Sequence, residues 1–532
     1  MRIFVIAFSF LLINSSLLQA QFFGPVDSRF NSIRQNGVST MEAWGDSLWI
    51  SPELNLNIAN SADWITPENA DSVTSADGRV FSLSLSPDTV VAGLGTSVEL
   101  NGASIPTAFG YYLSTDGGLN WEYINFPLDP APAEDCEINS AVYDPDCDIE
   151  FQYGNSTYRR TRITVPQQSP PYDIDHSGST ILSVNWASGL LRSTDFGQSW
   201  ERIILPPSSA DSLSPNSTYQ WASQYRGQNI ERYDPRYDNN LLGFGLLIDS
   251  NGTVWFGSAG GLNLSDNVLT APVEQVRWDH ISFSGPSNGL LGSWIIAIEE
   301  NPADGSIWMT NWSTSSSAGE RFGMVSTMDG GQTFERHLIG ERINDISFQD
   351  SYIFAAGDNG LFISDDNGQS WIKSPPLRSP NTFIKPSARY LSTAVTSDRV
   401  WIGTNDGIAS SSDFGNTWEI TRVNYPLRGG NIHDPTGRNT STYAYPNPFS
   451  PSIHDIVRIK FDVENTAEVD LRIFDFRMNL IKTLKSELLN TGNYEVIWDG
   501  YDQSGRKVAN APYIYVLDIG DERVTGKILV VD

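Results

Sequence analysis

The segment with the densest set of potential ligand-binding side chains is residues 219–237, which read YQWASQYRGQNIERYDPRY. Tyrosine, tryptophan and arginine are the residue types that anchor interfaces, and aromatic faces also stack on sugar rings. Because the chain as a whole is acidic, this local gathering of arginines predicts a binding site for an extracellular glycan or protein. The candidate ligand-binding residues are Trp221, Tyr225, Arg226, Arg232, Tyr233, Arg236 and Tyr237.

The same segment also has a purely structural interpretation, since aromatic residues are favoured in β-strands. It would then form outer strands of a sheet, with its arginines paired locally to Glu231, Asp234 and Asp238. Alanine substitution of Trp221 and Tyr225 separates the two interpretations. A binding role predicts lost binding at nearly unchanged thermal stability, whereas a packing role predicts a large loss of stability.

No catalytic residue can be assigned from the sequence. Two carboxylates facing each other across a pocket could hydrolyse a glycoside, but the 63 acidic residues offer no means of choosing a pair. No two histidines have the spacing of a metal-binding pair, and no motif for a cofactor is found. We therefore expect no cofactor and no metal. The five histidines are His176, His280, His337, His433 and His454.

The two cysteines, Cys136 and Cys147, lie close together in a polar stretch. In an oxidising compartment such a pair is expected to form a disulfide. The alternative is a calcium loop, because Asp144, Asp146 and Asp148 alternate as calcium ligands do. That alternative lacks the glycine of the sharp turn, where Ile149 stands, and a closing glutamate.

The N-terminal residues 1–20 combine one basic residue, Arg2, with an apolar run and a small residue at Ala20, which is typical of a secretory signal peptide. No later segment is apolar for long enough to span a bilayer. Loss of Arg2 with the signal peptide would change the formal charge from −29 to −30. Such acidity disfavours nucleic acid and anionic membranes as partners. The sequence therefore predicts an exported protein.

A short pattern, Ser/Thr-x-Asp-x-Gly-x-x-aromatic, occurs five times in the 532 residues. Its aspartate can accept backbone N–H bonds within its own turn, and its glycine can adopt the positive φ that closes the turn. The pattern resembles the Asp-box (BNR) repeat of sialidase-like β-propellers. The resemblance implies that these residues are peripheral scaffold and not catalytic acids: Asp116, Gly118, Asp195, Gly197, Asp329, Gly331, Asp366, Gly368, Asp413 and Gly415.

The spacing of these turns predicts the architecture. Repeats of about 55 to 60 residues suit four-stranded blades, each of which buries its faces only against its neighbours. We expect an all-β, seven-bladed β-propeller over residues 22–425, with six or eight blades as alternatives. Residues 21–40 are expected to supply a strand that closes the ring.

The sialidase resemblance also implies an arginine triad, an acid/base aspartate and a Tyr–Glu pair. The arginine-isoleucine-proline motif of that family is absent, and the nearest string is Arg162-Ile163-Thr164. We therefore expect a non-enzymatic binding protein, with a glycoside hydrolase of the sialidase-like or Asp-box polysaccharidase kind as the alternative. An axial pocket with two carboxylates about 5 to 10 Å apart and aromatic walls would favour hydrolysis.

A composition rich in Gly, Asn, Thr and Pro marks residues 426–442 as a linker. Strand-sized segments separated by turns then predict a small β-sandwich over residues 443–532. Asp499 and Asp502 suit hairpin turns there, with calcium binding as the alternative.

Four stretches of the C-terminal residues carry a second resemblance: YPNPF at 445–449, LRIFDFRMNLIKTL at 471–484, WDG at 498–500 with Asp502 and Gly505, and KILV at 527–530. They resemble the immunoglobulin-like C-terminal sorting domain of type IX secretion, which is akin to the flagellar hook-capping module. The resemblance implies passage through the outer membrane of a Gram-negative-type bacterium, contact with the secretion machinery, and frequent removal of the domain. We accordingly expect a secreted or cell-surface protein.

Overall fold

The structure is a computed structural model, and it describes residues 22–23, 32–58, 64–67, 79–132, 136, 142–283, 285, 289–314, 319–380, 382–425, 427 and 440–532. The predicted signal peptide, residues 1–20, and most of the predicted linker, residues 426–442, lie outside these ranges. Within them the chain is nearly all β, and helical turns occur at η2 (Pro145–Cys147), η3 (Asn239–Leu241), η4 (Val273–Gln275) and α2 (Pro451–His454). None of the described helices has the length and apolar character needed to span a membrane.

Most strands belong to small antiparallel sheets that follow one another along the chain, each built from consecutive strands. In chain order the sheets are β2 (Met41–Trp44), β3 (Ser47–Ile50) and β4 (Asn55–Ile58); β6 (Arg79–Leu85), β7 (Val90–Leu100), β8 (Ala103–Ser114) and β9 (Glu122–Asn125); β12 (Pro171–Ser177), β13 (Thr180–Asn185), β14 (Gly189–Ser193) and β15 (Glu201–Ile203); β19 (Gly243–Ile248), β20 (Val254–Ser258), β21 (Leu262–Ser265) and β22 (Trp278–Ile281), with β16 (Ser212–Leu213) at the edge; β23 (Trp294–Glu300), β24 (Ile307–Trp312), β25 (Gly323–Thr327) and β26 (Glu335–His337); β27 (Ile343–Gln349), β28 (Tyr352–Gly357), β29 (Gly360–Ser364) and β30 (Ile372–Lys373); and β33 (Tyr390–Thr396), β34 (Arg399–Thr404), β35 (Gly407–Ser411) and β36 (Glu419–Thr421).

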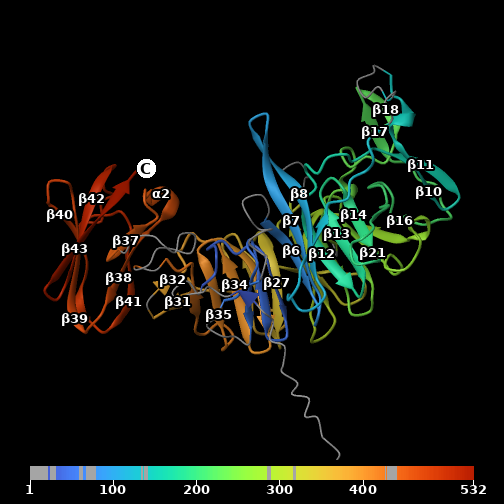
Figure 1. Ribbon diagram of the computed structural model, residues 1–532. Coiled ribbons are helices and arrows are strands. Elements are labelled where there is room, and N and C mark those ends of the chain that lie inside the picture. Colours follow the sequence, from blue (N-terminus) through green and yellow to red (C-terminus); the bar gives the residue numbers. More distant parts are fainter. Residues whose placement is uncertain are drawn as a thin grey trace, which may run out of the picture.

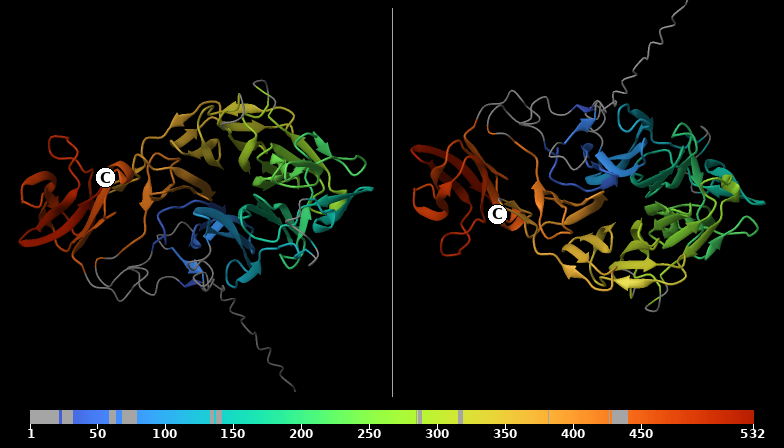
Figure 2. Two further views of the ribbon diagram at one scale, coloured as in Figure 1. Left: turned by 90° about the horizontal axis from the view of Figure 1, so that it is seen from above. Right: turned by 90° about the horizontal axis from the view of Figure 1, so that it is seen from below.

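These sheets are arranged as a closed ring. The first strand of each sheet contacts the first strand of the next, in the order β2, β6, β12, β19, β23, β27 and β33, and β33 contacts β2 again. The ring is seen along its axis in both views of Figure 2. Radial repetition of this kind lets each small sheet bury its faces against its two neighbours. The fold is therefore of the β-propeller class.

Hydrogen bonds join the N-terminal part of the ring to its C-terminal part, between residues that are far apart in the sequence. The N–H of Val38 donates to Thr404 O at 3.0 Å, and the N–H of Gly407 donates to Asn36 O at 2.7 Å. The hydroxyl of Ser392 on β33 donates to Val38 O at 3.1 Å. Residues of the expected closing segment 21–40 thus join the ring, but residues 32–40 do so without forming a strand.

The five repeated turns connect the third strand of a sheet to its fourth. In the turn after β29, the Ser364 hydroxyl donates to Asp366 and accepts the N–H of Gly368, both at 2.8 Å. The indole of Trp371 donates to Gly368 O at 3.1 Å. Hydrogen bonds from Ser370 lower the pKa of Asp366 to about 2. The hydroxyl-to-aspartate bond and the bond from the glycine N–H to that hydroxyl recur in the other four turns, so these carboxylates are already satisfied by their own turns.

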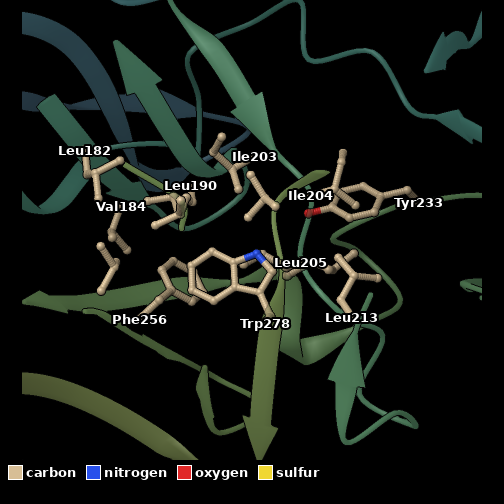
Figure 3. Close-up of a cluster of buried hydrophobic side chains, with 14 of the residues drawn as sticks. Leu182, Val184, Leu190, Ile203, Ile204, Leu205, Leu213, Tyr233, Phe256 and Trp278 are labelled. Carbon is tan, nitrogen blue, oxygen red and sulfur yellow. The ribbon is translucent and has the colours of Figure 1, made fainter. Parts of the chain in front are cut away.

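Two hairpins project from one side of the ring, at the upper right of Figure 1. One is β10 (Ile149–Tyr153) with β11 (Ser156–Arg160), and the other is β17 (Ala222–Tyr225) with β18 (Gln228–Glu231). They rest on a core that continues from the neighbouring sheets, and Figure 3 shows Tyr233 packed with Leu205, Leu213 and Trp278. This continuous core fixes both hairpins to the ring.

The C-terminal residues form two further antiparallel sheets with a core of their own. One contains β37 (Thr442–Tyr445), β38 (Val457–Val463) and β41 (Gly492–Trp498), and the other contains β39 (Ala467–Phe474), β40 (Leu480–Leu489), β42 (Ala511–Ile519) and β43 (Glu522–Val530). Their buried side chains, including Phe461, Trp498 and Tyr515, pack with one another. This unit lies beside the ring, next to β31 (Arg378–Ser379) and β32 (Thr382–Phe383) (Figure 1).

The two aspartates considered as calcium ligands in this C-terminal unit have protein partners. Lys482 Nζ contacts Asp499 Oδ1 at 2.8 Å. Asp502 accepts the N–H groups of Ser504 and Arg506 at 2.8 and 3.0 Å. The carboxylate of Asp499 is therefore used by an ion pair, and that of Asp502 by a tight turn.

Candidate functional site

A cavity of about 390 Å³ lies where the projecting β17–β18 hairpin meets the disulfide loop. Most of its lining side chains are polar or aromatic. Four arginines contribute to it in a chain whose net charge is −29. The lining residues are Pro132, Tyr143, Asp144, Cys147, Asp148, Thr161, Arg162, Thr164, Gln224, Tyr225, Arg226, Arg232, Arg236 and Tyr237.

The tip of the β17–β18 hairpin places Arg226 in this cavity. Arg226 and Gly227 both have positive φ, +48° and +82°, as a two-residue type I′ turn requires. The turn follows directly after Tyr225, and the Arg226 guanidinium lies 5.9 Å from the Tyr225 ring centre. Arg226 is exposed and makes no ion pair within the described part of the chain.

The opposite wall is held by the disulfide between Cys136 and Cys147, whose Cα atoms are 5.4 Å apart. Arg162 supports the same loop, because its Nε donates to Cys147 O at 2.8 Å and its Nη1 donates to Pro130 O at 3.1 Å. Asp144 caps η2 by accepting the N–H of Asp146 at 2.9 Å. The predicted disulfide is present.

Two of the arginines are bound by buried carboxylates. Arg232 contacts Asp148 at 3.2 Å and Asp234 at 2.6 Å, and Arg236 binds Asp234 through both Nε and Nη2. Burial raises the pKa of Asp148, against the lowering effect of its hydrogen bonds with Tyr143 and Arg232. Burial also disfavours ionisation of Asp234, but its bonds to Arg236 hold that pKa below its usual value.

Because Asp148 is engaged by Arg232 and Tyr143, the aspartates 144, 146 and 148 do not surround a common point as calcium ligands would. Among the described residues, no group of three or more His, Cys, Asp or Glu side chains is placed to hold a metal ion.

The structure divides the seven predicted ligand-binding residues into two groups. Tyr225, Arg226, Arg232, Arg236 and Tyr237 line the cavity, although Arg232 is itself buried. Trp221 and Tyr233 do not line it. They are only 1% and 4% exposed and belong to the apolar core beneath the hairpins. For these two residues the packing interpretation is the correct one.

The sequence interpretation missed the half of the cavity that comes from residues 143–164. Tyr143 and Arg162 reach the β17–β18 hairpin because the end of β11 lies beside residue 233. There Arg160 pairs with Tyr233 in a parallel β-bridge. No local pattern signals this pairing, since the two segments are separated by about seventy residues of chain. The cysteine pair was the available hint, because it marked residues 136–147 as a fixed loop.

A second group of titratable residues lies on the first strands of the ring. Glu42 is on β2, Asp173 and Asp175 on β12, Glu299 on β23 and Asp345 on β27. Burial raises the pKa of all five, to about 6 for Asp175 and about 7 for Asp345. Repulsion from the other carboxylates raises the pKa values of Glu42 and Glu299 further.

Three of these carboxylates link adjacent first strands. Asp173 accepts a hydrogen bond from the N–H of Leu246 at 2.8 Å, and Asp175 accepts one from the N–H of Ile248 at 2.7 Å. Asp345 accepts one from the N–H of Thr393 at 2.8 Å. They satisfy N–H groups on the neighbouring inner strand, which would otherwise be buried without a partner. Glu42 and Glu299 make no hydrogen bond or ion pair within the described ranges.

Aromatic residues occur near the starts of three first strands of the ring, β6, β12 and β19. A β-bulge makes Phe81, Tyr172 and Phe244 the extra residues of β6, β12 and β19. Bulges re-aim side chains. The rings then follow one another from sheet to sheet, with centres 6.3 Å apart for Phe81 and Tyr172 and 5.9 Å apart for Tyr172 and Phe244.

The ring of small antiparallel sheets defines the chain as a β-propeller protein. No family model matches it, and none of the curated proteins does. Among solved structures it is similar to PorZ of Porphyromonas gingivalis, described as an essential bacterial surface component of the type IX secretion system, with a TM-score of 0.35 and 14% identity over 93% of this chain and 75% of that one.

Two other solved structures give similar matches. One is a GH74 xyloglucanase from Xanthomonas campestris, with a TM-score of 0.46 and 11% identity over 93% of this chain and 74% of that one. The other is YCF48 from Cyanidioschyzon merolae, with a TM-score of 0.39 and 16% identity over 71% and 96%.

Proposed function

We propose that this chain is an exported, non-enzymatic β-propeller of seven blades that binds an extracellular glycan or protein in the cavity between the β17–β18 hairpin and the disulfide loop. The observation that carries the proposal is the cavity itself, in which Tyr and Arg side chains from two separate segments meet on a rigid base. Sites of this kind combine a preformed concave shape with a few well-placed polar groups.

The support of the cavity favours binding over a purely structural role. Trp221 and Tyr233 hold the hairpin to the core from below, whereas Tyr225 and Tyr237 lie outside that core and line the cavity. Tyr237 is 47% exposed. Aromatic side chains left exposed on a well-anchored element are typical of binding surfaces.

The proposal extends to export. Residues 443–532 form two packed sheets with a separate core, which suits the immunoglobulin-like sorting domain that their sequence resembles. We infer that this domain engages a type IX-like secretion machinery and that the protein resides at or beyond the outer surface of a Gram-negative-type bacterium. The repeated turns are inferred to be Asp-boxes with a scaffold role.

Binding is tested with the full secreted chain on an array of glycans and against extracts of surface proteins. A double Tyr225→Ala, Tyr237→Ala variant should lose the interaction while its melting temperature stays within a few degrees of the parent. The matched control is Tyr123→Ala, a similarly exposed tyrosine on β9, outside the cavity. A double variant that binds as well as the parent would contradict the proposal.

A second candidate function is glycoside hydrolysis, and the carboxylates of the inner strands are the observation that favours it. Glu42 and Glu299 have raised pKa values, as a general acid needs, and aromatic residues lie near the starts of the neighbouring inner strands. If the chain is a hydrolase, it should release reducing sugar from a polysaccharide, and Glu42→Gln or Glu299→Gln should reduce that rate by at least about a hundredfold.

A further inference from the structure

We propose that the ligand of the cavity is a glycan bearing a carboxylate, a sugar acid, whose charged group pairs with Arg226 and Arg162. This inference rests on the proposed function, because it specifies the ligand class of the same cavity.

The charge balance of the cavity is the first argument. Arg162 donates only to main-chain carbonyls, and Arg226 has no carboxylate partner within the described residues. Although Asp144 also lines the cavity, neither guanidinium forms an ion pair with a carboxylate of the described residues, unlike those of Arg232 and Arg236. A guanidinium presents a planar fork of donors that matches a carboxylate. In so acidic a chain, two such groups at one cavity are best explained by an anionic ligand.

The conformation of Arg226 is the second argument. The first central position of a type I′ turn favours Asn, Asp or Gly, because its φ is positive. Arginine occupies that position here, at φ +48°. Departures from such local preferences are concentrated at functional sites, and in this chain they also occur in scaffold turns, at Phe196 and Phe414. The tip of the hairpin thus places a long cationic side chain in the cavity where turn stability alone would favour a short one.

The remaining lining favours a sugar over an acidic peptide. Among the described residues that line the cavity, only Pro132 and the disulfide are apolar without being aromatic, so this lining does not form the apolar anchor pocket typical of peptide and protein interfaces. Tyr225 and Tyr237 offer ring faces for stacking. Thr161, Thr164 and Gln224 offer hydrogen-bonding groups for hydroxyls. A volume of about 390 Å³ lies within the range of small-ligand pockets.

The test uses the full secreted chain and an array of uronic-acid oligosaccharides, each printed beside its carboxyl-reduced neutral counterpart. We expect binding to at least one acidic glycan and a loss of roughly 10- to 100-fold on carboxyl reduction, the effect of one hydrogen bond to a charged group. Arg226→Ala should weaken binding by a similar factor, Arg226→Lys by less, and added salt should weaken binding by the parent.

The matched control is Arg277→Ala, since Arg277 is exposed, paired with Asp266 and outside the cavity. Unchanged melting temperature in Arg226→Ala excludes a folding defect. Equal binding of acidic and reduced glycans, binding to acidic peptides alone, or no binding to any acidic glycan overturns the sugar-acid inference. Binding that survives the double Tyr225→Ala, Tyr237→Ala substitution instead overturns the proposed function.

Discussion

Arg458 of β38 and Asp406, in the turn between β34 and β35, form a 2.7 Å ion pair in which both side chains are buried. The pair joins the C-terminal sheets to the last sheet of the ring. Arg422 contacts the same aspartate at 3.1 Å, and Arg458 also reaches Glu495 of β41 at 3.0 Å. The two units therefore share a compact cluster of charges that water reaches poorly, and their relative position is fixed by it.

Replacing Arg458 removes one cation from this cluster and leaves Asp406 and Glu495 with Arg422 as their remaining partner. Because Arg422 still pairs with Asp406, Arg458→Ala is expected to lower the free energy of unfolding by about 1.5–3 kcal/mol, the loss of hydrogen bonds to charged groups. Urea denaturation followed by tryptophan fluorescence measures the change. Arg506→Ala is the control, because Arg506 is highly exposed and its ion pair with Asp502 should contribute little. A loss in Arg458→Ala no larger than that of the control would show that the buried cluster does not couple the units.

Trp221 and Tyr225 lie four residues apart on the same hairpin but should respond differently to substitution. Trp221 is fully buried and its indole donates to Leu205 O at 3.3 Å, so Trp221→Ala should destabilise the protein by about 3–5 kcal/mol. Tyr225→Ala should cost less than about 1 kcal/mol and should weaken ligand binding instead. Denaturant midpoints and binding curves on the two variants check this. Equal stability losses would place Tyr225 in the core.

What sequence reasoning could predict was local. The turns around Asp366 and Gly368 follow from hydrogen bonds within eight residues, so their repetition was sufficient to predict the ring-forming hairpins. The disulfide between Cys136 and Cys147 was equally local. Trp221 shows the limit, since an aromatic residue in a strand has the same sequence signature whether it faces the core or a ligand.

The carboxylates of the inner strands could not have been predicted individually. Asp173 and Asp345 gain their roles from N–H groups of the neighbouring sheet, at Leu246 and Thr393, and no sequence spacing indicates which acidic residue faces the next inner strand. The same holds for Arg162, which meets the β17–β18 hairpin only through long-range packing.

The glycines of the repeated turns should differ in how much their substitution costs. A Cβ on Gly368 would lie 2.4 Å from Cη2 of Trp308 in the preceding sheet, whereas a Cβ on Gly330 would meet nothing within 4 Å. Both residues have positive φ, +84° and +70°, so alanine carries a backbone cost of about 1 kcal/mol at each. Gly368→Ala should lower the free energy of unfolding by about 1–3 kcal/mol more, because its Cβ would overpack the contact with Trp308.

Thermal and chemical denaturation of the two alanine variants measure this difference directly. Gly330→Ala is the matched control, because it changes the same kind of turn without touching another sheet. If both variants lose the same stability, the turn contributes only through its own backbone and not through contact with the preceding sheet.

The inner carboxylates predict how stability depends on pH. Their folded-state pKa values, about 6 for Asp175 and about 7 for Asp345, exceed the ordinary value of about 4. Between about pH 4 and about pH 7 these two carboxyl groups hold more protons in the folded chain than in the unfolded chain. Their contribution to the free energy of unfolding is therefore complete below about pH 4 and is lost as the pH rises toward about 7. The ionised cluster should therefore destabilise the ring at pH 8.

Glu299→Gln isolates this effect, because Glu299 has a raised pKa and no hydrogen-bonding partner within the described residues. The variant should be more stable than the parent at pH 8, because burial opposes ionisation of the parent side chain, and the gain should be smaller at pH 5, nearer the ordinary pKa of glutamate. Glu468→Gln is the control, because Glu468 is an exposed residue of β39, and it should change stability little at either pH. Equal effects at both pH values, or a destabilised Glu299→Gln at pH 8, would show that Glu299 is charged and favourably solvated in the folded ring.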